Sequence, residues 1–299
     1  MEISNMKNEG FIIKATGGFY YVRCGEETYE CRARGIFRKE GISPLCGDRV
    51  VFSIENNTGT VTEILPRKNE LVRPPVSNLD QLIIVISTRD PEPNCLVIDK
   101  LTAIAEIKKI EPVIVFTKTD LESPEGLREC YEKAGFEVIC VSSANGMGVE
   151  KVKAVLKGKL SAFTGNSGVG KSSLLNRIDS RLGLETGEIS HKLGRGRHTT
   201  RTVQLYQTGD GGWVADTPGF SSLDIERFET IFKDDLQYAF REFGPYWDNC
   251  RFNGCSHIRE KDCAVMGAVE NGEIPASRYQ SYCQLYDQVK GLKEWELKK

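Results

Sequence analysis

The sequence predicts a multidomain α/β protein with three parts, and three features of the chain support this prediction. Short β-prone runs fill residues 1–65, apolar strands alternate with helices over residues 66–224, and a cluster of cysteines interrupts the helical pattern of residues 225–299. We therefore expect an N-terminal β-barrel, a domain built on a mostly parallel sheet and a C-terminal helical domain that binds a metal.

The composition is that of an ordinary globular protein. Of the 299 residues, 39% are hydrophobic and 27% are charged, and a chain of this length holds two or three domains. No apolar run reaches the roughly eighteen residues of a membrane span, and the first residues lack a secretory pattern, so we expect a cytoplasmic protein without a membrane segment. The net charge of −2 leaves the partners open, but basic patches at residues 31–39 and 191–201 are typical of nucleic-acid binding.

Residues 1–65 contain five short runs with high β propensity, separated by Gly, Asn and Asp turns: GFIIKAT, GFYYVRC, ETYECRARG, DRVVFSI and GTVTEIL. Such runs favour a small barrel, most simply an OB-fold. The basic residues near the third run favour an RNA-binding surface, although a barrel that is only a scaffold would carry a similar solvated face. These residues are Arg32, Arg34, Arg38 and Lys39. The next segment, residues 65–81, contains proline and lacks periodicity, which predicts a linker.

Residues 82–223 alternate apolar strands with helices, which is the pattern of a mostly parallel sheet covered on both faces. The expected strands are 82–87, 112–117, 137–142, 160–165, 202–207 and 213–216, and the expected helices are 98–109, 124–134, 149–156 and 171–178. Beyond residue 225, apolar side chains at helical spacing predict a helix around 228–243 and another around 279–292.

Residues Gly165–Ser172 match GxxxxGK[ST], and the motif lies between a predicted strand and a predicted helix, as a phosphate-binding loop requires. Its glycines allow the backbone N–H groups to surround phosphate oxygens at the N-terminus of the helix. We expect Lys171 at the β- and γ-phosphates of a nucleotide and Ser172 on Mg²⁺. The predicted phosphate-binding residues are Gly165, Asn166, Ser167, Gly168, Val169, Gly170, Lys171, Ser172 and Ser173.

Two segments that follow the P-loop match the parts of a nucleotide switch. In WVADTPGF, Asp216 ends an apolar strand, where it is expected to hold Mg²⁺ through water, and the N–H of Gly219 is expected to contact the γ-phosphate. The polar loop GRGRHTTRT precedes this strand, and either Thr199 or Thr200 can complete the magnesium shell. We prefer Thr200, and an ordinary flexible loop is the alternative.

Two further loops predict which base is bound. TKTD follows an apolar strand and consists of Thr117, Lys118, Thr119 and Asp120. A carboxylate there accepts hydrogen bonds from guanine N1–H and N2–H₂, which adenine cannot supply, so Asp120 predicts GTP as the nucleotide. Lys118 is expected to lie along the base. The segment VSSANG follows the next strand, and a backbone N–H of Ser143 or Ala144 is expected to bind guanine O6.

The order of these loops is reversed relative to an ordinary GTP-binding domain, in which the base-reading loops come after the P-loop and DTPG. Moving the strands of TKTD and VSSA behind that of DTPG restores the ordinary order, so the sequence predicts a circularly permuted G domain over residues 66–224. Such a rearrangement leaves the sheet unchanged, because the ends of a domain lie at its surface and often close together. The chain then leaves this domain directly after the second switch.

Four potential metal ligands crowd into one short segment, namely Cys250, Cys255, His257 and Cys263, whereas the other cysteines are scattered. Three thiolates and an imidazole form a complete tetrahedral set for one structural Zn²⁺, with no position left for water. Cytosolic thiols stay reduced, which disfavours a disulfide framework, and reduced core cysteines are the alternative. Arg251 and Arg259 flank the ligands, where they can contact RNA phosphates or simply face water.

Several motifs together resemble those of the circularly permuted GTPases, and most closely those of the bacterial branch that depends on the small ribosomal subunit. They are GDRV, RKNELVRP, TKTD, GNSGVGKSSLLN, GRGRHTT, DTPGF and the Cys/His cluster, which span almost the whole chain. The resemblance implies an OB domain, a permuted G domain and a zinc domain, with GTP hydrolysis stimulated by the small subunit during its late maturation. We expect a monomer that binds this subunit and its rRNA. The alternatives are a general P-loop ATPase or kinase, a switch acting on another RNA, and an RNA-binding module whose nucleotide site is a relic.

The chain departs from this family at two positions. Thr117 stands where the family has Asn, and we expect its shorter side chain to lose a tie to the phosphate loop, which would affect affinity more than guanine specificity. Ser142-Ser143-Ala144 replaces the usual Ser-Ala-Lys, which matters little because this loop acts mainly through its backbone.

The residue that orients the attacking water is also not the usual one. Phe220 follows DTPG at the position where Ras-like enzymes carry Gln. His198 in the first switch loop is therefore expected to orient the water or accept its proton. Contact with RNA, or capping of the loop, is the alternative role of His198.

Overall fold

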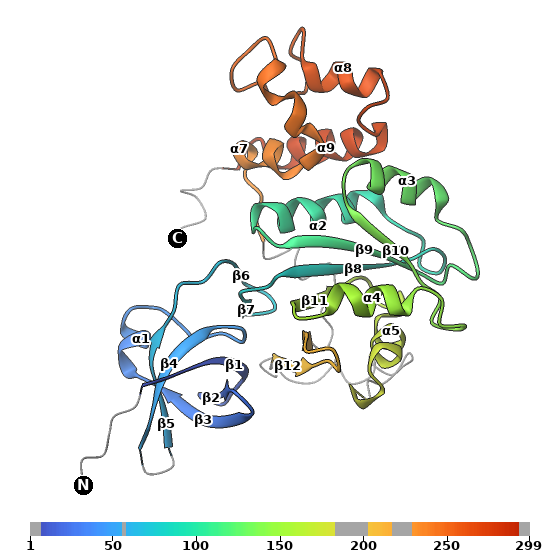
Figure 1. The fold of residues 1–299 in the computed structure, drawn as a ribbon. Helices are drawn as coiled ribbons and strands as arrows, with labels where there is room; N and C mark the ends of the chain where they lie inside the picture. Colours follow the sequence, from blue (N-terminus) through green and yellow to red (C-terminus); the bar gives the residue numbers. More distant parts are fainter. Residues whose placement is uncertain (1–6, 56–57, 183–202, 217–228, 293–299) are drawn as a thin grey trace, which may run out of the picture.

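The computed structural model describes residues 7–55, 58–182, 203–216 and 229–292, which form three parts along the chain (Figure 1). A β-barrel lies at the N-terminal end, a sheet with helices on both faces lies in the middle, and short helices form the C-terminal part. No helix in these ranges is long and apolar enough to cross a membrane. The fold class predicted from the sequence is confirmed.

The N-terminal barrel has the strand order of an OB-fold. Its elements are β1 (Asn8–Thr16), β2 (Phe19–Cys24), β3 (Glu27–Ala33), α1 (Gly35–Lys39), β4 (Arg49–Glu55) and β5 (Thr58–Ile64). The order is β1-β2-β3-β5-β4, and β4 pairs back onto β1, which closes the barrel. Apolar side chains fill its interior, among them the fully buried Ile12, Val22, Phe52 and Val61.

The segment between the barrel and the central domain is packed into the fold and is not the plain linker that we predicted over residues 65–81. It contains a two-stranded sheet of β6 (Glu70–Leu71) and β7 (Val76–Ser77). Leu71, Val76 and Leu79 are buried.

The polar residues of this segment satisfy a buried carboxylate of the barrel. Asp48 is fully buried, and it accepts hydrogen bonds from Nε of Arg67 (2.7 Å) and Oγ of Ser77 (2.6 Å). A buried charge needs such partners. The polar residues that suggested a linker are therefore explained by their hydrogen bonds to Asp48, which lies earlier in the chain, in the barrel.

The central domain contributes six strands in the order β10-β9-β8-β11-β13-β12. They are β8 (Gln81–Ser87), β9 (Glu111–Thr117), β10 (Glu137–Cys140), β11 (Leu160–Thr164), β12 (Gln204–Gln207) and β13 (Trp213–Asp216). All of them are parallel except β12, which runs antiparallel to β13. β12 also pairs with β1 at Gln204 and Lys14, so hydrogen bonding continues from the central sheet into the barrel.

Helices cover both faces of this sheet (Figure 1). α2 (Cys95–Ile107) and α3 (Glu125–Lys133) lie on one face, and α4 (Val149–Leu156) and α5 (Lys171–Ile178) lie on the other. Neighbouring residues of β8 contribute to the two different apolar cores on these faces. Since both faces are buried, the inner strands β8 and β9 are nearly continuous apolar runs that do not alternate with polar residues.

The C-terminal part is helical but more broken than the sequence predicts. α7 (Lys233–Leu236), η3 (Gln237–Ala239) and η4 (Arg241–Asn249) replace the single helix expected around 228–243. Phe240 has extended backbone angles (φ −109°, ψ 90°), and Pro245 lies inside the 3₁₀ segment η4. Both features prevent a regular α-helix there. The later helix is confirmed as α9 (Ala276–Val289), which packs against α2.

A buried ion network joins α9 to the central domain. Arg278 has no exposed surface, and it donates from Nε to Oε1 of Glu242 (2.7 Å) and from Nη1 to Oδ1 of Asp99 in α2 (2.8 Å). Tyr131 of α3 donates to the same Asp99 oxygen (2.9 Å). Burial alone would lower the pKa of Arg278, but Glu242 and Asp99 raise it, so the guanidinium stays charged.

Replacing Arg278 by alanine is expected to destabilise the protein by about 3–5 kcal/mol, because two carboxylates would remain buried without their cation. Denaturant unfolding measures the change. Arg128→Ala is the matched control, since Arg128 pairs with Glu132 on the exposed surface of α3 and its removal should change stability little. Similar losses in the two variants would contradict a special role for the buried network.

Candidate functional site

The predicted nucleotide-binding loops meet at one edge of the central sheet. The P-loop leaves the end of β11, TKTD leaves β9, VSSA leaves β10, and Asp216 ends β13. Because these strands are parallel, their carboxyl ends lie at the same edge, where ligands bind in open α/β sheets. The fold thus brings together loops that are far apart in the sequence.

The P-loop requires glycine for its conformation. Gly165, Gly168 and Gly170 have φ angles of +150°, +80° and +90°, which side chains rarely permit. A Cβ atom on Gly165 would also lie 2.2 Å from the carbonyl oxygen of Val85, so the loop packs backbone to backbone against β8. Gly170 precedes α5 without a side-chain cap, and the first N–H groups of this helix are therefore suited to an anion.

Lys171, the first residue of α5, is held inside this loop. Its Nζ donates to the carbonyl oxygens of Gly165 (2.5 Å) and Asn166 (2.9 Å). Burial lowers the pKa of Lys171 to about 8, because the charged form loses hydration. The amine therefore lies where phosphate oxygens are expected. Ser172 and Ser173 follow in the first turn of α5 and are half-buried.

The TKTD loop is tied to the P-loop through Thr117. Its buried hydroxyl donates to the carbonyl oxygen of Val169 at 2.5 Å and lies 3.2 Å from that of Ile86. The loss of this tie that we expected for threonine in place of Asn is therefore not found, whereas the effect on affinity stays a prediction. The short side chain of Thr117 reaches the P-loop because the two loops lie close together: a Cβ atom on Gly170 would lie only 3.8 Å from the hydroxyl oxygen of Thr117.

The other residues of TKTD surround the end of β9. Lys118 has a φ of +58°, and its Nζ donates to the carbonyl oxygen of Asp90. Oγ1 of Thr119 donates to the carbonyl oxygen of Val141 (3.0 Å), which joins this loop to the chain that follows β10. Asp120 is exposed, and no residue in the described ranges donates a hydrogen bond to its carboxylate. This carboxylate is available to a base.

The VSSA loop forms a turn after β10. The N–H of Ser142 donates to the carbonyl oxygen of Met147 (3.0 Å), and Oγ of Ser143 is buried without a partner in the described part of the chain. Arg177 of α5 donates to the carbonyl oxygens of Ser143 and Ala144. Arg177 could not be predicted from the sequence, because no motif marks it and its partners are more than thirty positions away.

Several predicted residues lie outside the described residues, namely His198, Thr199, Thr200, Gly219 and Phe220, as does the side chain of Arg38. The backbone of Asp216 lies at the end of β13, beside β11, whereas its side chain is not described. The roles expected of these residues stay predictions.

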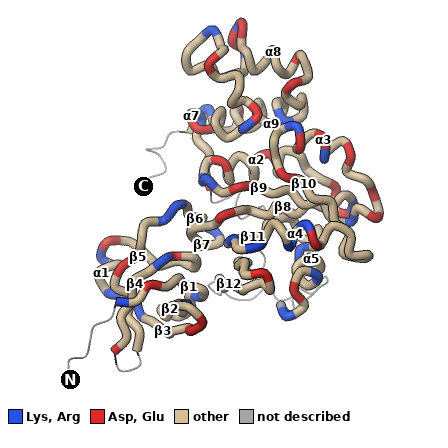
Figure 2. Tube along the Cα trace, in the orientation of Figure 1, with Lys and Arg blue, Asp and Glu red and all other residues tan. Residues whose placement is uncertain are grey.

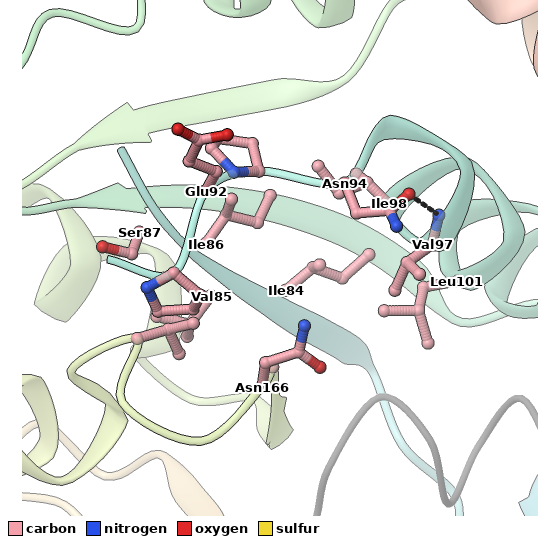
Figure 3. Close-up of a pocket in the computed structure, with 14 residues that line it drawn as sticks. Ile84, Val85, Ile86, Ser87, Glu92, Asn94, Val97, Ile98, Leu101 and Asn166 are labelled. Carbon is pink, nitrogen blue, oxygen red and sulfur yellow. Dashed lines mark hydrogen bonds between the residues drawn. The ribbon is translucent and has the colours of Figure 1, made fainter. Parts of the chain in front are cut away.

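A small recess lies beside the P-loop, between β8 and the N-terminal half of α2 (Figure 3). Ile84, Ile86, Ile98 and Leu101 line it, and Asn166 of the P-loop lies at its edge. Its apolar lining offers little to phosphates, which need the N–H groups of the loop. We therefore place the phosphates at the P-loop itself and not in this recess.

A second candidate site is the cluster of Cys250, Cys255, His257 and Cys263, whose ligand atoms all lie within 4.8 Å of one another. Nδ1 of His257 is 3.4 Å from Sγ of Cys263 and 3.6 Å from that of Cys250. Such separations fit four ligands around one tetrahedral ion. Burial raises the pKa of Cys255 to about 12, so thiolates at this site need a cation, and the donor set fits Zn²⁺.

The loop that carries these ligands is held by other side chains. The hydroxyl of Tyr279 donates to the carbonyl oxygen of His257 (2.8 Å), and that of Tyr282 donates to the carbonyl oxygen of Ser256 (2.6 Å). The carboxylate of Glu260 accepts from the N–H groups of Ser256, Ile258 and Arg259 at 2.9–3.0 Å. Tyr279 and Tyr282 therefore link the loop with the Cys/His ligands to α9, the helix that contacts the central domain.

Replacing Thr117 by valine is expected to weaken nucleotide binding about tenfold, because the Val169 carbonyl loses its donor and the two loops separate. Titration with a fluorescent guanine nucleotide measures the dissociation constant. Thr117→Ser keeps the hydroxyl and should retain most of the affinity. Unchanged binding by the valine variant would show that the hydroxyl does not hold the site together.

The pKa of about 8 for Lys171 predicts that nucleotide binding takes up protons. Above this pH the free amine is mostly neutral, whereas bound phosphate keeps it charged, so affinity should fall as the pH rises beyond about 8. Calorimetric titrations at about pH 8.5, in buffers with different ionisation enthalpies, measure the uptake, which should nearly vanish at about pH 7. No difference between the two pH values would contradict the lowered pKa.

Comparison with protein families and relatives extends these observations. The family model described as RsgA GTPase matches residues 64–226, and the one described as RsgA N-terminal domain matches residues 9–61. A protein of Caldanaerobacter subterraneus named small ribosomal subunit biogenesis GTPase RsgA is 49% identical over 286 residues, which cover 94% of this chain and 96% of the relative. The protein of that name from Geobacillus kaustophilus is 45% identical over 292 residues, which cover 95% and 98%.

Two solved structures share the fold. YjeQ from Thermotoga maritima has a TM-score of 0.81 at 36% identity, covering 96% of this chain and 100% of the other. YloQ, described as a circularly permuted GTPase, has a TM-score of 0.80 at 36% identity and covers 98% of each chain. The circular permutation predicted from the loop order is confirmed. With a family model over more than half of its length and relatives that match nearly all of it, the chain belongs to the RsgA GTPase family.

Proposed function

We propose that this GTPase binds the small ribosomal subunit and acts late in its maturation, hydrolysing GTP to GDP and phosphate at a rate that the subunit stimulates. One observation carries the GTP-binding part of the proposal: the phosphate loop and the base loop are joined by Thr117 at the carboxyl edge of the sheet. The relatives named small ribosomal subunit biogenesis GTPase support the choice of partner.

The phosphate half of the proposed site stabilises negative charge. Lys171 contacts the β- and γ-phosphates, and the N–H groups of the P-loop surround their oxygens. Mg²⁺, when bound, offsets the charge that develops on these oxygens. The residues that would hold it are Ser172, Thr200 and Asp216, and the N–H of Gly219 would contact the γ-phosphate. His198 is proposed to orient the attacking water.

The base half selects guanine. The exposed carboxylate of Asp120 accepts hydrogen bonds from guanine N1–H and N2–H₂, and the stem of Lys118 lies along the ring. A backbone N–H of Ser143 or Ala144 donates to O6. Adenine has an acceptor at N1, no amino group at C2 and a donor at position 6, so it would leave the carboxylate without a donor.

Two surfaces are proposed to contact rRNA. Arg32, Arg34 and Lys39 are exposed on the barrel, and Figure 2 shows basic residues around α1. Arg251 and Arg259 are exposed beside the metal cluster, where Arg251 also pairs with Asp262 (2.8 Å). Cations of this kind bind the phosphate backbone without reading sequence.

We also propose that one structural Zn²⁺ binds Cys250, Cys255, His257 and Cys263 and orders the loop between η4 and α8 (Ala264–Glu270). The protein is proposed to act as a monomer in the cytoplasm, where bacterial ribosomal subunits are assembled.

GTP turnover measured with and without purified small subunits tests this function. The subunit is expected to raise turnover by roughly tenfold or more, because it supplies contacts that order the switch loops. Purified large subunits are the control and should have little effect. No stimulation would remove the small subunit from the proposal, and ATP binding as tight as GTP binding would favour a general P-loop ATPase.

A further inference from the structure

Arg177 makes an unusual pair of contacts with the loop that is proposed to read guanine O6. It lies in the last turn of α5, and it donates from Nε to the carbonyl oxygen of Ser143 (2.9 Å) and from Nη2 to that of Ala144 (3.0 Å). A guanidinium is planar, and its donors are fixed relative to one another. One side chain therefore fixes the orientation of two successive peptide units.

The geometry of a peptide then determines where the N–H groups of this loop point. The C=O and N–H of a trans peptide lie in one plane and point in opposite directions. Since the carbonyl of Ser143 points to Arg177, the N–H of Ala144 in the same peptide points away from it. The carbonyl of Ala144 likewise sets the N–H of Asn145, but that group already donates to Oγ of Ser142 (3.4 Å).

Of the N–H groups of Ala144 and Asn145, only that of Ala144 is therefore left for a ligand. No residue in the described ranges accepts a hydrogen bond from the N–H of Ala144. Of the two candidates for the O6 donor, Ala144 and Ser143, Ala144 is the one whose N–H belongs to a peptide that Arg177 holds.

A neighbouring arginine shows what an ordinary surface contact looks like. Arg181 binds the carboxylate of Asp179, two residues away, with Nε at 2.9 Å and Nη2 at 2.5 Å. Arg177 has no carboxylate partner in the described part of the chain, and its donors go to neutral carbonyls of a distant loop. It therefore joins the helix that follows the P-loop to the loop that follows β10.

We infer that Arg177 is a positioning residue for guanine recognition: by holding the carbonyls of Ser143 and Ala144, it directs the N–H of Ala144 toward O6. The inference rests on the proposed role of this loop. It also gives α5 two tasks, because the N-terminus of this helix faces the phosphates while Arg177, at its other end, sets the base contact.

The test compares three nucleotides on the full-length protein and on Arg177→Ala. GDP is the reference, 6-thio-GDP replaces O6 by the weaker acceptor sulfur, and IDP lacks only the 2-amino group. Arg177→Ala is expected to lower the preference for GDP over 6-thio-GDP by about fivefold to tenfold. Its preference for GDP over IDP should stay unchanged, since Asp120 reads the 2-amino group.

Arg181→Ala is the matched control, because it removes a neighbouring exposed arginine that does not touch the loop, and both preferences should stay as in the wild type. Arg177→Lys, which keeps a single donor, should give an intermediate value. If both preferences fall together in Arg177→Ala, or neither falls, Arg177 does not position the loop. If the wild-type protein binds 6-thio-GDP as tightly as GDP, the proposed role of the loop itself fails.

Discussion

The hydrogen bond from the Thr117 hydroxyl to the Val169 carbonyl oxygen holds the two halves of the nucleotide site together. One half, from β11 and α5, is proposed to bind phosphates, and the other, from β9 and β10, is proposed to select the base. β8 lies between β9 and β11, so no pairing of strands joins the halves directly. This bond and the Arg177 contacts with the VSSA loop join the two halves instead. A ligand that spans both halves depends on the distance between them.

Local patterns predicted most of the fold and much of the site. Continuous apolar runs predicted the parallel sheet. The glycines and Lys171 predicted the P-loop, because this loop is made of residues that are adjacent in the chain. Features that depend on distant partners were missed or misjudged. The segment at residues 65–81 looked like a linker because its partner, Asp48, lies in the barrel. The contacts of Arg177 and the hydrogen bond of Thr117 escaped prediction for the same reason. Phe240 interrupts the predicted helix although the apolar side chains keep helical spacing.

Buried charges fix how the three parts meet. Arg278 of α9 is satisfied by Asp99 of α2, and Asp48 of the barrel is satisfied by Arg67. Glu229 is buried, and its carboxylate accepts a hydrogen bond from the N–H of Val72 (2.6 Å) and pairs with Nζ of Lys108 (2.8 Å). Moving one part against another would leave such a charge without its partner, which is costly. These pairs therefore favour one arrangement of the parts.

The strand order also sets the sequence of events while the protein is being made. β8, β9 and β10 precede β11 in the chain, so the half of the sheet that is proposed to select the base leaves the ribosome ahead of the P-loop. Chains begin to fold from their N-terminal end during synthesis, yet β8 gains its neighbour β11 only after residues 160–164 have emerged. Any structure that these first three strands form before then is formed without the P-loop, whereas an unpermuted relative would make its P-loop first.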